Sequence, residues 1–156
     1  MKSLLKSALA LSFVSAAFLA APASAESDPN EAIKFRKAIM EVVGGHTVAL
    51  FAILQQKVPH QDALIYHAEN LAAIAKHTKP AFEQNTAGKG NEETTAKDIA
   101  WDGPEFMERL GGLETASANL SAALKSGDGA AIGAAAQELG GSCKGCHDKF
   151  RDEHDH

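Results

Sequence analysis

Two cysteines and a histidine near the C-terminus carry the most specific chemistry in this sequence. They stand in Cys143-Lys144-Gly145-Cys146-His147, which is the complete C-x-x-C-H pentapeptide of covalent haem attachment. Positions i, i+3 and i+4 of a helix share one face, so both thiols can form thioethers with the vinyl groups of one porphyrin. His147 is then left as an axial nitrogen ligand. The motif therefore predicts one covalent haem c with its iron.

The same residues could build three other sites. A redox-active dithiol normally opens a helix in an α/β fold, where the helix dipole lowers the thiol pKa, whereas this pair stands near the end of a helix. A zinc site needs four ligands, and two of His147, His154 and His156 could join the two cysteines. A disulfide would close a strained three-residue loop. Haem is the preferred prediction because the pentapeptide is complete and the expected fold is helical.

The first 25 residues have the pattern of a secretory signal peptide. Lys2 and Lys6 precede an apolar run over residues 8–21, and Ala23-Ser24-Ala25 forms a small-residue cleavage site. Cleavage is predicted to leave one domain over residues 26–156. We expect no other segment to be long and apolar enough to span a bilayer, so no membrane contact is predicted after cleavage. The simplest destination is a bacterial periplasm.

Length and charge exclude several classes of protein. The 156 residues suffice for one domain with a core, and two cysteines cannot build a disulfide-rich scaffold. The net charge is −5, so no nucleic-acid partner is predicted. Loss of Lys2 and Lys6 with the signal would leave 13 basic and 20 acidic side chains, a net charge of −7. Such a surface favours basic partner proteins.

Apolar residues recur at helical spacing in four segments and predict an all-α, antiparallel up-down-up-down four-helix bundle. Asp28 is a suitable N-cap for the first helix, with Pro29 at its first position. Pro80 is expected to kink or end the second helix. The expected helices cover residues 28–57, 61–84, 104–125 and 130–151, and residues 85–103 form one long loop.

Three features of the chain occur together in one known family. The haem motif lies on the last helix, the first helix contains Arg36 and Met40 followed by Gly44-Gly45-His46, and Trp101 precedes the third helix. Over residues 26–151 the chain resembles the class II c-type cytochromes, the family of cytochrome c′ and cytochrome c-556. The resemblance implies that Arg36 contacts a haem propionate and that Met40 is the distal axial ligand or lines the distal pocket. It also implies that Trp101 packs near the haem and that Arg151 lies on its proximal face.

The resemblance implies one of two functions, and neither makes the protein an enzyme. With His147 and Met40 both on the iron, the protein would carry electrons among periplasmic redox proteins, because His/Met ligation raises the reduction potential. With Met40 only packed over an open distal face, five-coordinate iron would bind NO or CO in a gas-binding or protective role. The electron carrier is the preferred prediction, since the segment from Arg36 to His46 looks closer to the c-556 members. A homodimer is a further possibility that the family suggests.

The remaining histidines are expected to take no part in the haem site. His46 is six residues from Met40 and therefore on another face of the helix. Exposed positions on helices or turns are expected for His60, His67 and His77.

Overall fold

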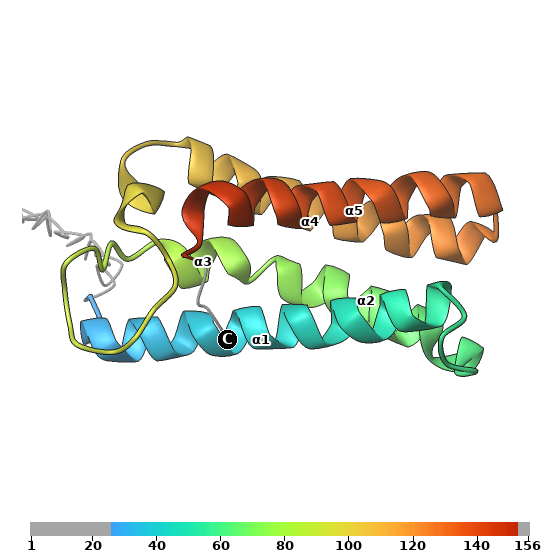
Figure 1. Ribbon diagram of the computed structural model, residues 1–156, viewed down its shortest axis with the longest axis horizontal. Coiled ribbons are helices and arrows are strands. Elements are labelled where there is room, and N and C mark those ends of the chain that lie inside the picture. The colour runs from blue at the N-terminus through green and yellow to red at the C-terminus, as the bar shows by residue number, and fades with distance from the viewer. Residues whose placement is uncertain (1–25, 153–156) are drawn as a thin grey trace, which may run out of the picture.

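The computed structural model describes residues 26–152, which form an antiparallel helical bundle. Figure 1 shows its four long helices running alternately along the long axis: α1 (Pro29–Leu54), α2 (Leu64–Ala75), α4 (Glu105–Ser126) and α5 (Gly129–Phe150). Helix α1 packs on α2, α2 packs on α4, and α4 packs on α5. The predicted all-α, up-down-up-down four-helix bundle is confirmed. The expected signal peptide lies outside the described residues.

The helix ends follow from local chemistry. The Asp28 carboxylate accepts hydrogen bonds from backbone N–H groups at the start of α1, and Asp128 does the same for α5. Gly127 ends α4 with a φ of +72°, a left-handed conformation that glycine adopts without a Cβ penalty. Helix α1 ends at Leu54, three residues before the expected end. The α4–α5 turn is therefore short and sharply defined.

The expected helix over residues 61–84 is wrong as one continuous element. It divides into a 3₁₀ turn η1 (Gln61–Ala63), α2, and a short helix α3 (Thr78–Phe82). The break falls at Lys76 and His77, and Pro80 lies inside α3. Proline lacks an N–H to donate to the carbonyl four residues earlier, and its ring clashes with that carbonyl. The carbonyl in question belongs to Lys76, so Pro80 interrupts the helix upstream of itself.

The long loop over residues 85–103 is confirmed, and it is tied to both ends of the chain. The Asn30 side-chain oxygen accepts hydrogen bonds from the backbone N–H groups of Asn91 at 2.8 Å and Glu92 at 2.9 Å. The Lys97 N–H donates to the carbonyl of Phe150 at 2.9 Å. The neighbouring residues Ala96 and Arg151 form an isolated antiparallel β-bridge. Residues 26–152 contain no β-strand. The loop ends in a second 3₁₀ turn, η2 (Asp98–Trp101), and covers the end of the bundle where α5 finishes (Figure 1).

Two groups of buried apolar side chains lie along the bundle. The main core joins α1, α2, α4 and α5 and includes Leu50, Leu71, Leu120 and Leu139, each almost completely buried. The second group, which we call the aromatic cluster, lies where α3, η2, α4 and α5 meet. Its buried members are Ala81, Phe82, Ala100, Phe106, Leu110 and Phe150.

Helix α1 corrects one expectation about membranes. We expected no segment after the signal peptide to be long and apolar enough to cross a bilayer, but α1 meets both criteria by length and composition. In the structure it lies along α2 and also packs on α3. It is therefore one wall of the bundle.

Candidate functional site

The three residues of the attachment motif lie in the last turns of α5 and are half-buried. Cys143 packs against the main core, whereas Cys146 packs against the aromatic cluster. Both thiols are free. They therefore face the interior of the bundle from neighbouring turns, one toward each group of buried side chains.

Burial of these thiols argues against a redox-active dithiol. Burial raises the pKa of Cys143 and of Cys146, and the nearby Arg109 only partly offsets this for Cys146. A reactive dithiol needs the thiolate, which a lowered pKa favours. Within residues 26–152, no three or more His, Cys, Asp and Glu side chains gather as a metal site, and His154 and His156 lie outside this range. The arrangement fits covalent attachment better than either alternative.

The surroundings of His147 favour the neutral imidazole, which is the form that can act as a nitrogen ligand. Burial is the main cause that lowers its pKa, and the charge of Arg151 adds to the effect, while Asp148 opposes it. A lowered pKa keeps the imidazole neutral near pH 7, with one nitrogen lone pair free to bind iron. The side chain follows Cys146 directly, as the attachment motif requires.

Arg36 is a buried cation with few partners. Its side chain is 2% exposed, and its guanidinium carbon lies 5.0 Å from the Trp101 ring centre and 5.5 Å from that of Phe82. One long hydrogen bond of 3.5 Å reaches the Thr94 hydroxyl, while Nε and Nη1 have no hydrogen-bond partner within residues 26–152. A buried charge is costly unless an opposite charge and hydrogen bonds satisfy it. The free N–H groups fit a carboxylate, such as a haem propionate, and burial lowers the Arg36 pKa.

Met40 lies one turn after Arg36 on α1 and faces the same region. It is half-buried and packs against the aromatic cluster, as Cys146 and Trp101 also do. Helices α1 and α5 thus contribute a thioether and an attachment cysteine to one apolar compartment. A porphyrin needs such apolar surroundings for its ring, with cationic groups for its propionates. The residues present therefore fit a haem.

Trp101 and Arg151 occupy different environments. The Trp101 indole N–H donates to the Phe82 carbonyl at 3.0 Å, and its ring lies 6.4 Å from that of Phe106, centre to centre. This places it in the compartment with Arg36. Arg151 is exposed at the end of α5, and its backbone forms the bridge to Ala96. Its contact with a haem stays a prediction.

A network of charged side chains beside the motif was not predicted from the sequence. Arg109 on α4 pairs with Glu105 at 2.9 Å, and Lys149 on α5 also bonds Glu105. A Cβ placed on Gly145 would lie 2.8 Å from Arg109 Nη1. The glycine within the motif thus admits the arginine from α4. The four-residue spacing of Glu105 and Arg109 was the signal that could have identified this pair.

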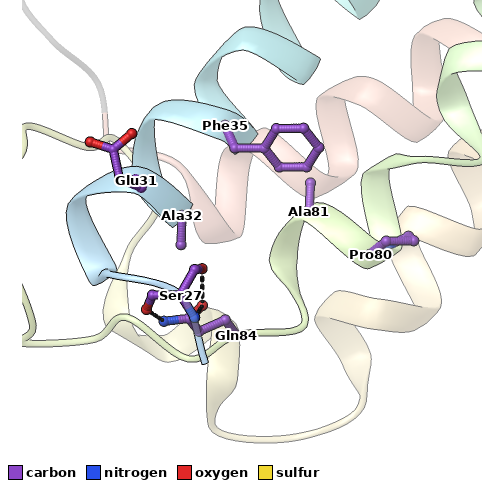
Figure 2. A pocket seen from close by; sticks show the side chains of 7 residues that line it. All are labelled: Ser27, Glu31, Ala32, Phe35, Pro80, Ala81 and Gln84. Atoms are coloured by element: carbon purple, nitrogen blue, oxygen red, sulfur yellow. Dashed lines mark hydrogen bonds between the residues drawn. The ribbon is translucent and has the colours of Figure 1, made fainter. Parts of the chain in front are cut away.

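A surface pocket of about 390 Å³ lies apart from these residues. Figure 2 shows it between the start of α1 and α3, with the Phe35 ring and Ala81 on one side and Ser27 bonded to Gln84 on the other. No cysteine or histidine lines it. The pocket is therefore not the haem compartment.

Comparison with known proteins shows the family to which this chain belongs. Residues 31–151 match the family described as Cytochrome C'. Cytochrome c' of Pararhodospirillum photometricum is 35% identical over 127 residues, which cover 81% of this chain and all of that protein. The crystal structure of cytochrome c' from Rubrivivax gelatinosus superposes with a TM-score of 0.72 at 34% identity, covering 81% and 98% of the two chains.

A third similar protein has a ligand in its printed description. It is the nitric oxide complex of a variant of cytochrome c prime from Alcaligenes xylosoxidans. Its TM-score is 0.70 at 25% identity, and the match covers 83% of this chain and all of that one. The motif on α5, the unpaired Arg36 and these matches lead to one assignment. The chain belongs to the cytochrome c′ family, the class II c-type cytochromes, and its cofactor is covalent haem c with iron.

Proposed function

We propose that this protein carries electrons in the periplasm, with His147 and Met40 as the two axial ligands of its haem. The observation that supports this proposal is the position of the Met40 thioether, which packs against the same aromatic cluster as Cys146. The haem supplies a one-electron iron couple, whose potential is raised by His/Met ligation. With both axial positions filled by protein, no substrate reaches the iron and no catalysis is expected.

The chain's own residues bind and shield the cofactor. Cys143 and Cys146 tether it, and the Arg36 N–H groups hold a propionate. The rings of Phe82, Phe106 and Phe150 pack edge to face at 5.0 and 5.1 Å between neighbouring centres and exclude water. A dry and rigid compartment limits the reorganisation that accompanies a change of charge.

The decisive experiment is an absorption spectrum of the ferric and ferrous haem-loaded protein, with and without NO. Ligation by Met40 predicts a sharp low-spin ferrous α band that changes little with gas. Met40→Ala should then convert the protein to a high-spin form. Met107→Ala is the matched control, because Met107 is also half-buried against the aromatic cluster but lies on α4. A high-spin spectrum in the unmodified protein would contradict the carrier proposal.

The second candidate is a five-coordinate protein that binds NO or CO. The nitric oxide complex of the Alcaligenes relative favours it, since that protein binds the gas in the same fold. Here Met40 would serve only as an apolar cover over the distal face. A broad high-spin spectrum that shifts on addition of NO, and that Met40→Ala leaves high-spin, would support this candidate.

We propose periplasmic redox proteins with basic surfaces as partners, since the mature chain is predicted to be acidic. A homodimer is a separate prediction. The exposed apolar side chains of Phe35, Val42 and Val48 on α1 are compatible with it. Light scattering of the mature protein would measure its mass directly, and a monomer at high concentration would contradict a dimer.

A further inference from the structure

Two histidines outside the haem compartment face each other across two helices. His46 on α1 and His67 on α2 approach to 3.1 Å between their Nδ1 atoms. Their ring centres are 5.3 Å apart, and the planes are tilted by 59°. Both side chains are half-buried, so the expectation that His67 is exposed is wrong. His46 lies about 9 Å further along α1 than Met40, at 1.5 Å per residue.

The contact joins two nitrogens of the same kind. A neutral imidazole has one N–H donor and one acceptor nitrogen, so a hydrogen bond here needs one Nδ1 to carry the proton and the other to offer its lone pair. Burial, and to a lesser degree the charge of His67, lower the pKa of His46. The His46 ring is therefore neutral near pH 7. A neutral imidazole is the form that binds metals.

The spacing of the two nitrogens suits one transition-metal ion. Ligand nitrogens bind zinc at about 2.0–2.1 Å, so two of them on one ion lie about 2.9–3.4 Å apart for angles between square and tetrahedral. The observed separation falls inside that interval. On binding the ion, the ring that donates the hydrogen bond would lose its Nδ1 proton and carry one on Nε2 instead, as the other tautomer of a neutral imidazole. Small rotations about the Cβ–Cγ bonds, which are soft torsions, would then turn both Nδ1 lone pairs toward a common centre. We propose that His46 and His67 form a binding site for a divalent transition-metal ion of the zinc type, between α1 and α2.

Within residues 26–152 no third His, Cys, Asp or Glu side chain gathers with this pair, so protein side chains of these types supply only two ligands. His46, but not His67, lines a neighbouring groove of about 220 Å³ together with Val42, Asn70, Ala73, Ile74 and His77. No carboxylate lines this groove, and the Tyr66 ring lies 5.4 Å from that of His67, centre to centre. Water would therefore complete the sphere. Two imidazoles select zinc, copper or nickel over magnesium or calcium, which prefer oxygen ligands.

Calorimetric titration with Zn²⁺ tests the site in the mature, haem-loaded protein. His154 and His156 are first changed to Gln in every sample, which removes the tail as a competing ligand, and His147 is occupied by haem iron. The parent should bind one ion per chain at about pH 7.5. His46→Gln and His67→Gln should each weaken binding by about tenfold or more. His60→Gln, an exposed histidine in the α1–α2 connection, should change binding by less than about twofold.

Two further measurements decide what the titration means. An anomalous difference map from a zinc-soaked crystal should place the ion between the two Nδ1 atoms, and unchanged haem spectra of the variants would show that they fold. Equal Zn²⁺ binding by the His46→Gln/His67→Gln double variant and its parent would overturn the proposal. So would loss of binding in His77→Gln with full binding in His67→Gln. Neither result bears on the haem ligands, so the two proposals fail independently.

Discussion

Arg36 is the residue whose environment says most about the site. Its guanidinium is enclosed by two aromatic rings, and two of its nitrogens lack a partner among the described residues. A buried hydrogen bond to a charged group contributes about 1.5–3 kcal/mol to stability. The interior thus keeps a charge that an anion would both neutralise and hydrogen-bond, and a haem propionate is such an anion.

Arg36→Met should lower the reduction potential of the haem-loaded protein. A nearby cation disfavours the ferric state, which carries one more positive charge, and its removal favours oxidation. The variant should also lose about 1–3 kcal/mol of unfolding free energy. Potentiometry and urea denaturation measure the two effects. Lys37→Met is the control, because Lys37 is a more exposed side chain paired with Glu92 at 3.3 Å. An unchanged potential in Arg36→Met would contradict the propionate contact.

The His46 pKa predicts a pH dependence of stability. Burial first, and then the charge of His67, lower this pKa from its ordinary 6.5. The unfolded chain therefore takes up a proton on His46 more readily than the folded chain does. Because of this difference, the free energy of unfolding decreases as the pH drops below about 6.5. Urea midpoints at about pH 7.5 and 5.5 should differ less in His46→Gln than in the parent. His60→Gln should keep the parent's difference, and an equal difference in all three proteins would refute the assignment.

At the scale of elements, the helices were predictable where one local signal decides the outcome. Asp28, Pro29 and the apolar stripe placed α1, and Asp128 with the haem motif placed α5. The break between α2 and α3 was misplaced because proline acts on the carbonyl four residues upstream. The His46–His67 contact was missed because it joins separate helices, and sequence spacing within one helix carries no information about it. The roles of Arg36 and Met40 came from the resemblance and from their shared helical face.

The α4–α5 turn offers a direct test of one such local signal. Gly127→Ala should reduce stability by about 1 kcal/mol, because alanine is strained at the observed positive φ. Gly129→Ala is the matched control in the same turn, since a Cβ there meets nothing within 4 Å and its φ is not in the left-handed range. Thermal or urea denaturation compares the two. Equal losses would show that φ at Gly127 is not the cause.

At the scale of the whole molecule, the two ends of the bundle are built differently. The end with the α1–α2 and α4–α5 connections has short links between long helices (Figure 1). The opposite end is assembled from the short helix α3, the turn η2 and the long loop, held by the aromatic cluster and by hydrogen bonds such as those to Asn30. The haem motif lies at this second end. Local opening should therefore begin there, where few helical turns must separate.

The acidic surface should govern how fast electrons are exchanged. We expect oxidation of the mature ferrous protein by a cationic cobalt complex to slow as salt rises, because salt screens the attraction. Oxidation by anionic ferricyanide should instead become faster, since screening removes a repulsion. Stopped-flow absorption at several ionic strengths measures both. The same salt slope for the two oxidants would contradict an electrostatic control of the exchange.

The unpaired guanidinium of Arg36 on α1 also bears on how quickly haem-free protein is degraded in the cell. A chain that has not received haem must fold around an uncompensated charge, or leave that end of the bundle open. Proteases cleave such opened states in proportion to their population. We therefore expect haem-free chains to be cleared quickly, so that the amount of this protein follows the supply of haem. Arg36 would then make the stability of the protein depend on whether haem has been attached.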